Sequence, residues 1–402
     1  MSVVKRKLSK SFNAFFNSEK SGGILLIVCT LVSLLLTNSP IGKQYLSLWH
    51  LDLAGLSLEL WVNDALMAIF FLLIGLELER ELYVGELSDF KNALLPIFGA
   101  IGGVVTPAAI HFAMNSGTPT QAGMGIPMAT DIAFALGVLA LLGSRVPASL
   151  KVFLTALAVM DDLAAIIVIA VFYTASLSTA YLFGAFAVFG ILILLNKAGV
   201  KKMIPYLVGG VLMWFLMLKS GVHATIAGVL LGFAIPFSTK DDDEDSLSYK
   251  MEHFLHKPVV FIILPIFALA NTGILIDSES LQTLTHPNEL GIMLGLFIGK
   301  PIGITILSLL AVMVGICKLP LDLNWKHIFG AGILGGIGFT MSIFITNLAF
   351  AGNIVEISGS KMAILLASLV AGTFGFLWLK FFGHPNESDD DMETMDFEMT
   401  EV

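Results

Sequence analysis

One apolar stretch, residues 156–174, limits what this chain can fold into; it reads ALAVMDDLAAIIVIAVFYT. As a helix that rises ~1.5 Å per residue, it is long enough to cross the hydrocarbon core of a bilayer. Asp161 and Asp162 stand side by side within it, and each carboxylate costs roughly 2.5–3.5 kcal/mol to insert into a membrane. An ionisable residue at that depth is a functional-site candidate by default, so we take this pair as the candidate functional site of the chain.

The composition of the chain agrees with a membrane protein. Of its 402 residues, 56% are hydrophobic and only 13% are charged, whereas soluble proteins carry about 25% charged residues. Apolar segments recur at 23–38, 60–78, 94–114, 121–143, 149–174, 180–196, 204–218, 222–236, 258–276, 289–315, 327–350 and 357–382. The sequence therefore predicts an all-α polytopic membrane protein of about twelve spans, with residues 1–382 forming a single transmembrane domain in the lipid bilayer.

The distribution of lysine and arginine orients these spans. With the N-terminus placed in the cytoplasm, nearly every Lys and Arg falls on the cytoplasmic side. Lys43, Lys219 and Lys361 fall outside, and Lys300 alone lies within a span. A positive-inside bias of this strength predicts that both termini are cytoplasmic.

The net charge of −9 is concentrated in two acidic segments, 241–245 and the tail at 383–402. Runs of like charge are usually solvated and disordered. We therefore predict a disordered cytoplasmic tail and no nucleic-acid partner, and the role of both segments stays open.

Residues 45–60, between the first two spans, read YLSLWHLDLAGLSLEL. Their near-strict alternation around Ala54-Gly55 predicts a small β-hairpin at 45–58. A lone hairpin is only marginally stable in water, so it would need a partner such as the same hairpin of a second subunit. A loop lying on the membrane surface is the alternative.

Two spans, the fourth and the eleventh, look broken. The stretch GMGIPMATDIAF at 123–134 places Gly and Pro residues ahead of Thr130 and Asp131, and GAGILGGIGFTMSIF at 330–344 is rich in glycine. Close helix packing would also explain the glycines of the second stretch. Because one stretch lies in each half of the chain and each precedes an unbroken span, the pair indicates a transporter whose binding site lies at the breaks.

Asp131 and Lys300 add charge near these breaks. A carboxylate at Asp131 would offset the positive partial charge of half-helix N-termini. Lys300, in GLFIGKPIGI, is the only cation deep in an apolar span and would suit a carboxylate or the negative end of a half-helix. A purely structural salt bridge is the alternative for Lys300.

Asp161 and Asp162 project about 100° apart on a helix, so one can line a water-filled cavity while the other reaches toward Lys300. Neighbouring like charges favour holding a proton and a nearby ammonium favours releasing it, so the pair can exchange protons near neutral pH. When ionised, the carboxylates are hard oxygen ligands for Na⁺ or Li⁺, with hydroxyls and carbonyls such as those of Thr130 completing the shell. One site that binds either protons or a cation is sufficient for exchange.

The chain resembles the bacterial NhaA-type sodium/proton antiporters from about residue 12 to 382. The motifs that carry the resemblance are PMATDIAFALG (127–137), VMDDLAAIIVIAVFYT (159–174), GVHATIAGVLLGF (221–233), GKPIGI (299–304) and GIGFTMSIFI (336–345). The resemblance implies inverted-topology repeats with discontinuous crossing helices in spans 4 and 11. It also implies a place in the bacterial inner membrane and exchange of cytosolic Na⁺ or Li⁺ for external H⁺.

The resemblance assigns roles residue by residue. Asp162 matches the principal cation-binding and proton-exchanging aspartate, with Asp161 beside it. Lys300 matches a lysine that pairs with Asp161 and can carry a proton. Asp131, with Thr130, matches the group that compensates the charge of the crossing half-helices, and the hairpin at 45–58 matches the element that joins a homodimer.

The resemblance further implies activation at alkaline pH. The matching cytoplasmic positions are Glu77, Arg80, Glu81, Glu252, His253 and His256, with His223 modulating the response. Carboxylates and histidines at the mouth of a cavity can report cytosolic pH, although an ordinary solvated network is the simpler interpretation of these residues. Glu79 stands where well-known members have a basic residue, which leaves the pH set-point open.

Other functional classes fit the residues less well. An intramembrane aspartyl protease needs its two aspartates on separate helices, typically with a G-x-G-D stretch that this sequence lacks. A retinal protein has seven spans around an aromatic cage, and a passive cation channel needs no residues poised to take protons. We therefore expect a secondary active transporter rather than an enzyme, working by alternating access without a cofactor. Two carboxylates leave room for more than one proton per cation, so electrogenic exchange is expected.

Overall fold

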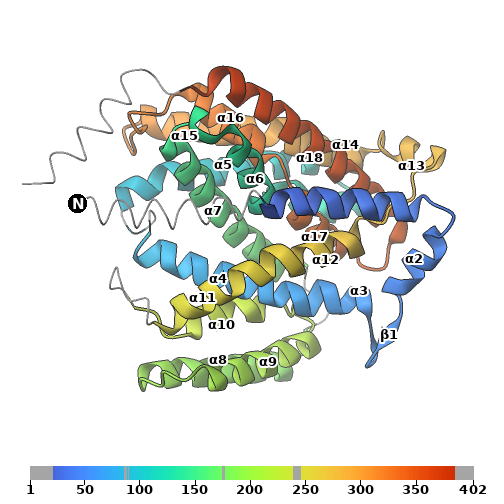
Figure 1. Cartoon of the computed structure of the whole chain (residues 1–402), viewed down its shortest axis with the longest axis vertical. Coiled ribbons are helices and arrows are strands. Elements are labelled where there is room, and N and C mark those ends of the chain that lie inside the picture. Colours follow the sequence, from blue (N-terminus) through green and yellow to red (C-terminus); the bar gives the residue numbers. More distant parts are fainter. Residues whose placement is uncertain (1–20, 86–87, 89, 174–176, 239–245, 385–402) are drawn as a thin grey trace, which may run out of the picture.

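The computed structural model describes residues 21–85, 88, 90–173, 177–238 and 246–384 (Figure 1). The acidic segment 241–245 and the tail beyond His384 lie outside the described residues. Within the described ranges, the regular structure is helical apart from one two-stranded sheet. This agrees with the all-α prediction.

The helices follow the predicted apolar segments. In chain order they are a first helix at Ser21–Thr37, α2 (Gly42–Trp49), α3 (Leu58–Leu60), η1 (Trp61–Leu66), α4 (Met67–Tyr83), α5 (Phe90–Asn115), η2 (Pro119–Met128), α6 (Ile132–Leu142), η3 (Gly143–Arg145), α7 (Ala148–Phe172), α8 (Thr179–Lys197), α9 (Met203–Ser220), α10 (Ile226–Ala234), α11 (Leu247–Pro258), η4 (Val259–Ile263), α12 (Leu264–Asn271), α13 (Ser278–Thr283), α14 (Pro287–Leu294), η5 (Gly295–Gly299), α15 (Lys300–Met313), α16 (Trp325–Gly335), α17 (Phe339–Ala349) and α18 (Ile354–Phe382).

Nine helices in the described part of the chain are long and apolar enough to cross a membrane, and two bent pairs raise that number to eleven. The first helix is bent against α2 by 119°, and α16 is bent against α17 by 47°. The predicted segment at 222–236 is different, because its helix α10 covers only Ile226–Ala234. At ~1.5 Å per residue, α10 is ~13 Å long and does not cross a bilayer by itself. The chain is thus a multi-pass membrane protein with nine to eleven candidate spans.

Three of the long helices contain a π-helical turn: η1 precedes α4, η4 lies between α11 and α12, and η5 lies between α14 and α15. The turn η5 ends directly before Lys300, and Pro301 follows without a backbone N–H to donate. Turns of this kind are frequent at functional sites. The helix that carries Lys300 is therefore irregular where the lysine leaves it.

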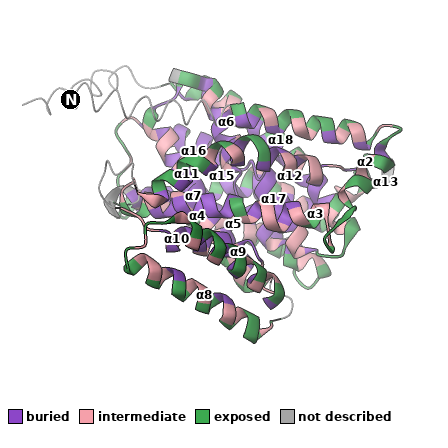
Figure 2. Ribbon diagram, turned by 60° about the horizontal axis from the view of Figure 1, so that its bottom comes forward, coloured by how far each residue is buried: buried purple, intermediate pink, exposed green. Residues whose placement is uncertain are grey.

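The helices form two groups, which Figure 1 shows above and below the middle of the molecule. We call α5–α7 together with α14–α18 the core bundle, in which α5 packs against α7, α14 and α15, and α18 packs against α14, α16 and α17. We call α4 with α8–α12 the flanking bundle, in which α10 joins α4 to α9. In Figure 2, buried residues gather along α4, α7 and α17, whereas α8 at the edge is largely exposed or intermediate. The centre of burial thus lies where the two bundles meet.

The core bundle is held by a close approach of α5 and α15. A Cβ added at Gly102 would lie 2.0 Å from the carbonyl oxygen of Gly303, and one at Gly303 would lie 2.1 Å from the carbonyl oxygen of Gly102. Further along, the added Cβ of Gly299 would lie 2.9 Å from Cα of Pro107. Since residue numbers rise on α5 as they fall on its partner, the two helices run antiparallel.

The predicted hairpin at 45–58 is shorter than expected. Residues 45–49 belong to α2, and the sheet pairs β1 (Asp52–Leu53) with β2 (Leu56–Ser57) in antiparallel register. Ala54 and Gly55 have φ of 57° and 86°, as a two-residue type I′ turn requires. The prediction of a strand over 45–49 was wrong because apolar residues at 45, 46, 48 and 49 fit a helical period as well as a partial alternation.

Candidate functional site

The two broken spans meet at their breaks. The first break separates η2 from α6 and the second separates α16 from α17. Across them, the N–H of Asp131 donates to the carbonyl of Ile337 at 2.7 Å, and the hydroxyl of Thr130 lies 2.9 Å from the carbonyl oxygen of Gly335. Backbone groups that a continuous helix would satisfy internally are thus bonded across the two breaks.

Asp131 caps both half-helices that start at the breaks. Its Oδ1 accepts from the N–H of Phe134 at 2.9 Å, which makes it the N-cap of α6. Its Oδ2 accepts from the N–H of Thr340 at 3.0 Å and from the Thr340 hydroxyl, at the start of α17. A carboxylate at two helix N-termini offsets the positive ends of two dipoles. This is the position from which the predicted charge compensation would act.

Asp161, Thr130 and Lys300 form one buried cluster from three different helical segments. The Thr130 hydroxyl lies 2.6 Å from Oδ2 of Asp161, and the Lys300 ammonium donates to Thr130 Oγ1 at 2.5 Å and also to Asp161 Oδ2. All three side chains are fully buried. Because desolvation makes a buried charge costly without its partner, removing either ion would leave the other uncompensated. The predicted pairing of Lys300 with Asp161 is therefore present in the structure.

Asp162 has a different environment, although it is the neighbouring residue on α7. It is fully buried, and neither of its carboxylate oxygens has a hydrogen-bond partner among the described residues. Oδ1 of Asp161 also has no partner there. An ionised carboxylate in such a place is stable only with a counter-ion. The two aspartates can therefore take up either a proton or a cation.

The donors around the aspartates suit an alkali cation rather than a resident transition metal. No group of three or more His, Cys, Asp or Glu side chains in the described ranges is arranged to hold a metal ion. The oxygens near the breaks are those of two carboxylates, the Thr130 hydroxyl and backbone carbonyls such as that of Gly335. Oxygen ligands of this kind favour hard cations.

The residues of the predicted pH response come together only in part. Arg80 of α4 contacts Glu252 of α11, and its Nη2 lies 3.7 Å from Oε1 of Glu81. Nδ1 of His256 lies 4.0 Å from Oε1 of Glu77, so α4 and α11 bring these five residues into one group. The sequence pattern alone could not distinguish this network from an ordinary solvated loop.

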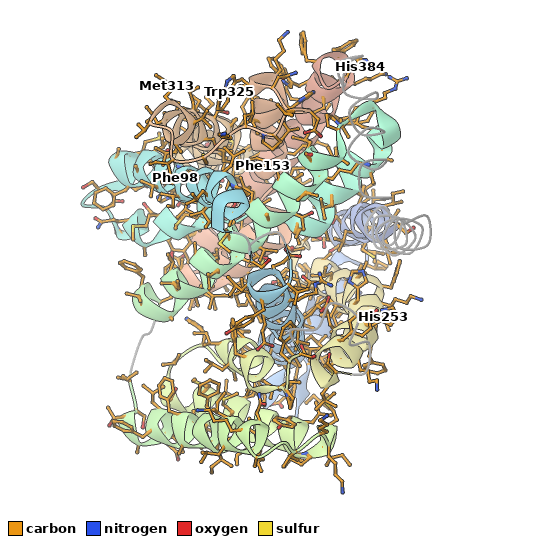
Figure 3. All side chains as sticks on the ribbon, turned by 90° about the vertical axis from the view of Figure 1, so that its left-hand side faces the viewer. Phe98, Phe153, His253, Met313, Trp325 and His384 are labelled. Carbon is orange, nitrogen blue, oxygen red and sulfur yellow. The ribbon has the colours of Figure 1, made fainter. Side chains whose placement is uncertain are left out.

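His253 and His223 occupy other places. His253 stacks on the ring of Tyr249 at 6.2 Å, and Figure 3 shows it on α11, away from Phe98 and Phe153 of the core bundle. His223 lies before α10, where its Nε2 is 2.8 Å from the carbonyl oxygen of Tyr173. No hydrogen bond or ion pair described for His223 joins it to the α4–α11 group.

Glu79, the departure noted in the sequence, is buried in α4. It is 7% exposed, and its Oε2 has no hydrogen-bond partner in the described part of the chain. It is one helix position from Arg80, which contacts Glu252. A carboxyl group rather than a basic one therefore stands beside the α4–α11 group.

Sequence reasoning missed Thr340 as a site residue. Thr340 is an inconspicuous residue of the glycine-rich stretch 330–344, and its bonds to the carboxylate of Asp131 form only where the two breaks meet. Ser342 is similar, since its hydroxyl donates to the carbonyl of Ile126 in η2 at 2.7 Å. The signal that could have found them is a hydroxyl residue close to each break: Thr130 lies in the first, and Thr340 follows the second.

Comparison with known proteins gives a consistent result. Residues 13–379 match the profile of the family described as Na+/H+ antiporter 1. The chain is 70% identical over 383 residues to the Na(+)/H(+) antiporter NhaA of Dechloromonas aromatica, covering 95% of this chain and 98% of that protein. It is 60% identical to the NhaA of Flavobacterium psychrophilum, covering 93% and 97% of the two chains, and 49% identical to that of Vibrio alginolyticus, covering 91% and 96%. The similarity extends over both breaks and α7.

Proposed function

The chain belongs to the Na⁺/H⁺ antiporter 1 family, and on that premise we propose that it exchanges cytosolic Na⁺ or Li⁺ for external protons by alternating access. As a member of this family it is a multi-pass sodium/proton antiporter, not an enzyme. One observation carries the proposed site: two buried aspartates lie beside crossing helix breaks, and both have carboxylate oxygens that no described residue bonds.

Asp162 is the principal group in the proposed cycle. When the site faces the cytoplasm, deprotonated Asp162 and Oδ1 of Asp161 take a cation, and Thr130 with backbone carbonyls at the breaks completes its shell. When the site faces outside, protons replace the cation on the same oxygens. Binding of the two is mutually exclusive because both need the same lone pairs, and this competition couples the flows.

Lys300 and Asp131 support this cycle in different ways. Lys300 neutralises Asp161 while no cation is bound, so a cation that enters competes with the ammonium for that carboxylate. Two carboxylates and one ammonium give room for more than one proton per cation, and we propose electrogenic exchange on that basis. Asp131 keeps the two half-helices capped while the breaks change their environment.

We also propose that the α4–α11 group mediates activation at alkaline pH. Its members are Glu77, Arg80, Glu81, Glu252 and His256, with His253 beside it and His223 acting from its separate place near Tyr173. The group couples α4 to α11, so a change of its charge would bear on how these helices pack. Glu79 would shift the set-point relative to family members with a basic residue there.

The proposed setting is the bacterial inner membrane, with both termini cytoplasmic. We propose twelve crossing segments in residues 1–382, with α10 as the short one, and inverted repeats built on α5–α7 and α14–α18. The antiparallel approach of α5 and α15 supports that relation. The hairpin at 52–57 would lie on the periplasmic side and join a homodimer.

The test is sodium-dependent collapse of an imposed pH gradient in proteoliposomes, comparing the wild type with Asp162→Asn near neutral and at alkaline pH. We expect collapse with Na⁺ and Li⁺ in the wild type, stronger at alkaline pH, and none in the variant. Asp322→Asn is the matched control, because it removes a carboxylate between α15 and α16, away from the site.

Each outcome of this test bears on a different part of the proposal. Exchange by Asp162→Asn at the wild-type rate would remove the assignment of the central aspartate. Sodium moved uphill by an imposed proton gradient distinguishes antiport from a passive channel. A folded wild type that responds to neither ion would contradict the exchange itself.

A further inference from the structure

A second group of buried polar side chains lies between α5, α14 and α18, outside the site described above. His111, Asn288, Glu289 and Ser360 are at most 2% exposed. Asn288 joins them: its Oδ1 lies 3.1 Å from Nε2 of His111, and its Nδ2 lies 3.1 Å from Oε1 of Glu289 and 2.9 Å from Oγ of Ser360. We call these four residues the outer polar cluster.

Two atoms of the outer polar cluster have no hydrogen-bond partner among the described residues: Oε2 of Glu289 and Nδ1 of His111. With its Nε2–H directed at Asn288, a neutral His111 carries its lone pair on Nδ1. The charged or titratable groups that act on Glu289 are Glu356 of α18 and His286 before α14, and neither is a permanent cation. An acid and a base thus stand in one buried cluster, each with a free position for a proton.

Glycines on three segments make room for the cluster. An added Cβ at Gly291 of α14 would lie 2.9 Å from Cδ2 of His111, and one at Gly359 of α18 would lie 2.5 Å from Oε1 of Glu289. One at Gly123 of η2 would lie 3.1 Å from Oδ1 of Asn288. The cluster therefore touches η2, the first part of a broken span.

The outer polar cluster lies further along the same helices that contact the two aspartates and carry Lys300. On α5, an added Cβ at Gly103 would lie 3.7 Å from Oδ1 of Asp161, and His111 follows eight residues, or ~12 Å, later. On the antiparallel partner, Glu289 precedes Lys300 by eleven residues, or ~17 Å. The cluster lies toward the ends where α5 finishes and α14 begins, which the positive-inside bias places outside.

From these contacts we propose that Glu289, bridged through Asn288 to His111, is a second proton-binding site on the external route to Asp161 and Asp162. An external proton binds Oε2 of Glu289, forming an O–H bond and a neutral acid. On release that bond breaks, and the proton passes to water or to Nδ1 of His111. The inference rests on the proposed antiport, because the proton is the one that the exchange brings in.

The test measures sodium efflux from right-side-out proteoliposomes with internal sodium and pH fixed and external pH varied. Glu289→Gln keeps an oxygen for the hydrogen bond from Asn288 but cannot bind the proton. We expect efflux roughly tenfold slower than the wild type at alkaline external pH, where proton capture is limiting, and convergence with the wild type at acid external pH. The KM for internal sodium should not change.

Three further variants separate a proton site from a structural one. Glu289→Asp keeps a titratable carboxyl group and should recover much of the rate, whereas a merely structural role would favour Gln over Asp. His111→Gln should give the same defect, selective for alkaline external pH. Glu59→Gln removes a carboxylate at the same end of the molecule, outside the cluster, and should behave as the wild type.

Two results would overturn the inference. One is a folded Glu289→Gln protein that follows the wild type at every external pH. The other is an equal loss at every external pH together with a raised KM for sodium, because a proton-loading group matters least when protons are abundant. Failure of antiport itself would show differently, as a wild type without sodium efflux coupled to protons.

Discussion

At the scale of single residues, the Thr130 hydroxyl contacts three groups of the site: Lys300, Asp161 and the carbonyl of Gly335. Its hydroxyl accepts from Lys300 and has one proton to donate, either to Asp161 at 2.6 Å or to the carbonyl of Gly335 at 2.9 Å. It therefore joins the charged pair to the second break. A change of charge at Asp161 can switch this one proton between two acceptors.

We predict that Thr130→Val raises the KM for sodium about tenfold or more, because hydrogen bonds to charged groups contribute about 1.5–3 kcal/mol. Thr130→Ser keeps the hydroxyl and should stay within about threefold of the wild type. The measurement is the sodium dependence of exchange in proteoliposomes. Thr155→Val is the control, since the bond described for that hydroxyl runs to the carbonyl of Lys151 within α7. A wild-type KM in Thr130→Val would exclude this role.

Sequence analysis could identify charged residues of the site but not its polar partners. Asp161, Asp162, Asp131 and Lys300 were evident because charge in an apolar span is costly. Thr340 is an ordinary residue in the sequence, and it becomes part of the site only because two segments 209 positions apart cross. The outer polar cluster was missed for the same reason, since its members come from three helices.

At the scale of helices, the contact of Gly102 with Gly303 sets how closely α5 and α15 approach. We predict that Gly303→Ala lowers the free energy of unfolding by about 1–3 kcal/mol, the usual cost of overpacking. Its methyl group would meet the backbone of Gly102 and the Thr106 hydroxyl. Thermal unfolding of the purified protein measures the change.

Gly190→Ala in α8 is the matched control for that substitution. Nothing lies within 4 Å of an added Cβ at Gly190, so alanine should leave the melting temperature unchanged or raise it slightly through its better helix propensity. Equal melting temperatures for the two variants would mean that α5 and α15 separate without cost.

The positions of helices were easier to predict than their lengths. Apolar length and Gly or Pro punctuation located the spans and both breaks. Hydropathy could not show that 222–236 contains only the nine-residue α10, because an extended apolar segment and a helix have the same composition. Nor could alternation at 45–49 distinguish a strand from α2.

At the scale of the whole molecule, the hairpin exposes apolar side chains that the rest of the described chain does not cover. Leu51 and Leu53 are 55% and 56% exposed, and the Leu58 N–H already donates to the Leu51 carbonyl at 3.0 Å. Replacing residues 52–57 with two glycines would therefore close the chain with little disturbance.

We predict that this deletion converts the proposed homodimer into a monomer while each chain keeps its exchange activity, because the hairpin lies far from the aspartates in sequence and at the edge of the molecule (Figure 1). Light scattering of the detergent-solubilised protein gives the mass, and proteoliposome exchange gives the activity. Leu321→Ser, which removes an exposed leucine elsewhere, is the control. A deletion variant that remains dimeric would show that another surface joins the subunits.

The two bundles are also joined by a group of three amide side chains and one lysine. Oδ1 of Asn271 accepts from Asn347 at 2.7 Å and from Lys361 at 3.4 Å, while its Nδ2 donates to Asn63 at 2.8 Å. Asn63 and Asn271 lie on η1 and α12, and the other two lie on α17 and α18 of the core bundle. If the two bundles move against each other in the proposed alternating-access cycle, we expect these bonds to break.

The double cap at Asp131 also bears on how such a gene can change by recombination. One carboxylate caps the N-termini of two half-helices that are encoded far apart, in different halves of the chain. A crossover that brings in a related second half keeps its helix capped only if the first half still supplies this acid. Recombination between related genes is therefore expected to keep the two halves together. Their similar patterns of spans alone would suggest that the halves could be exchanged.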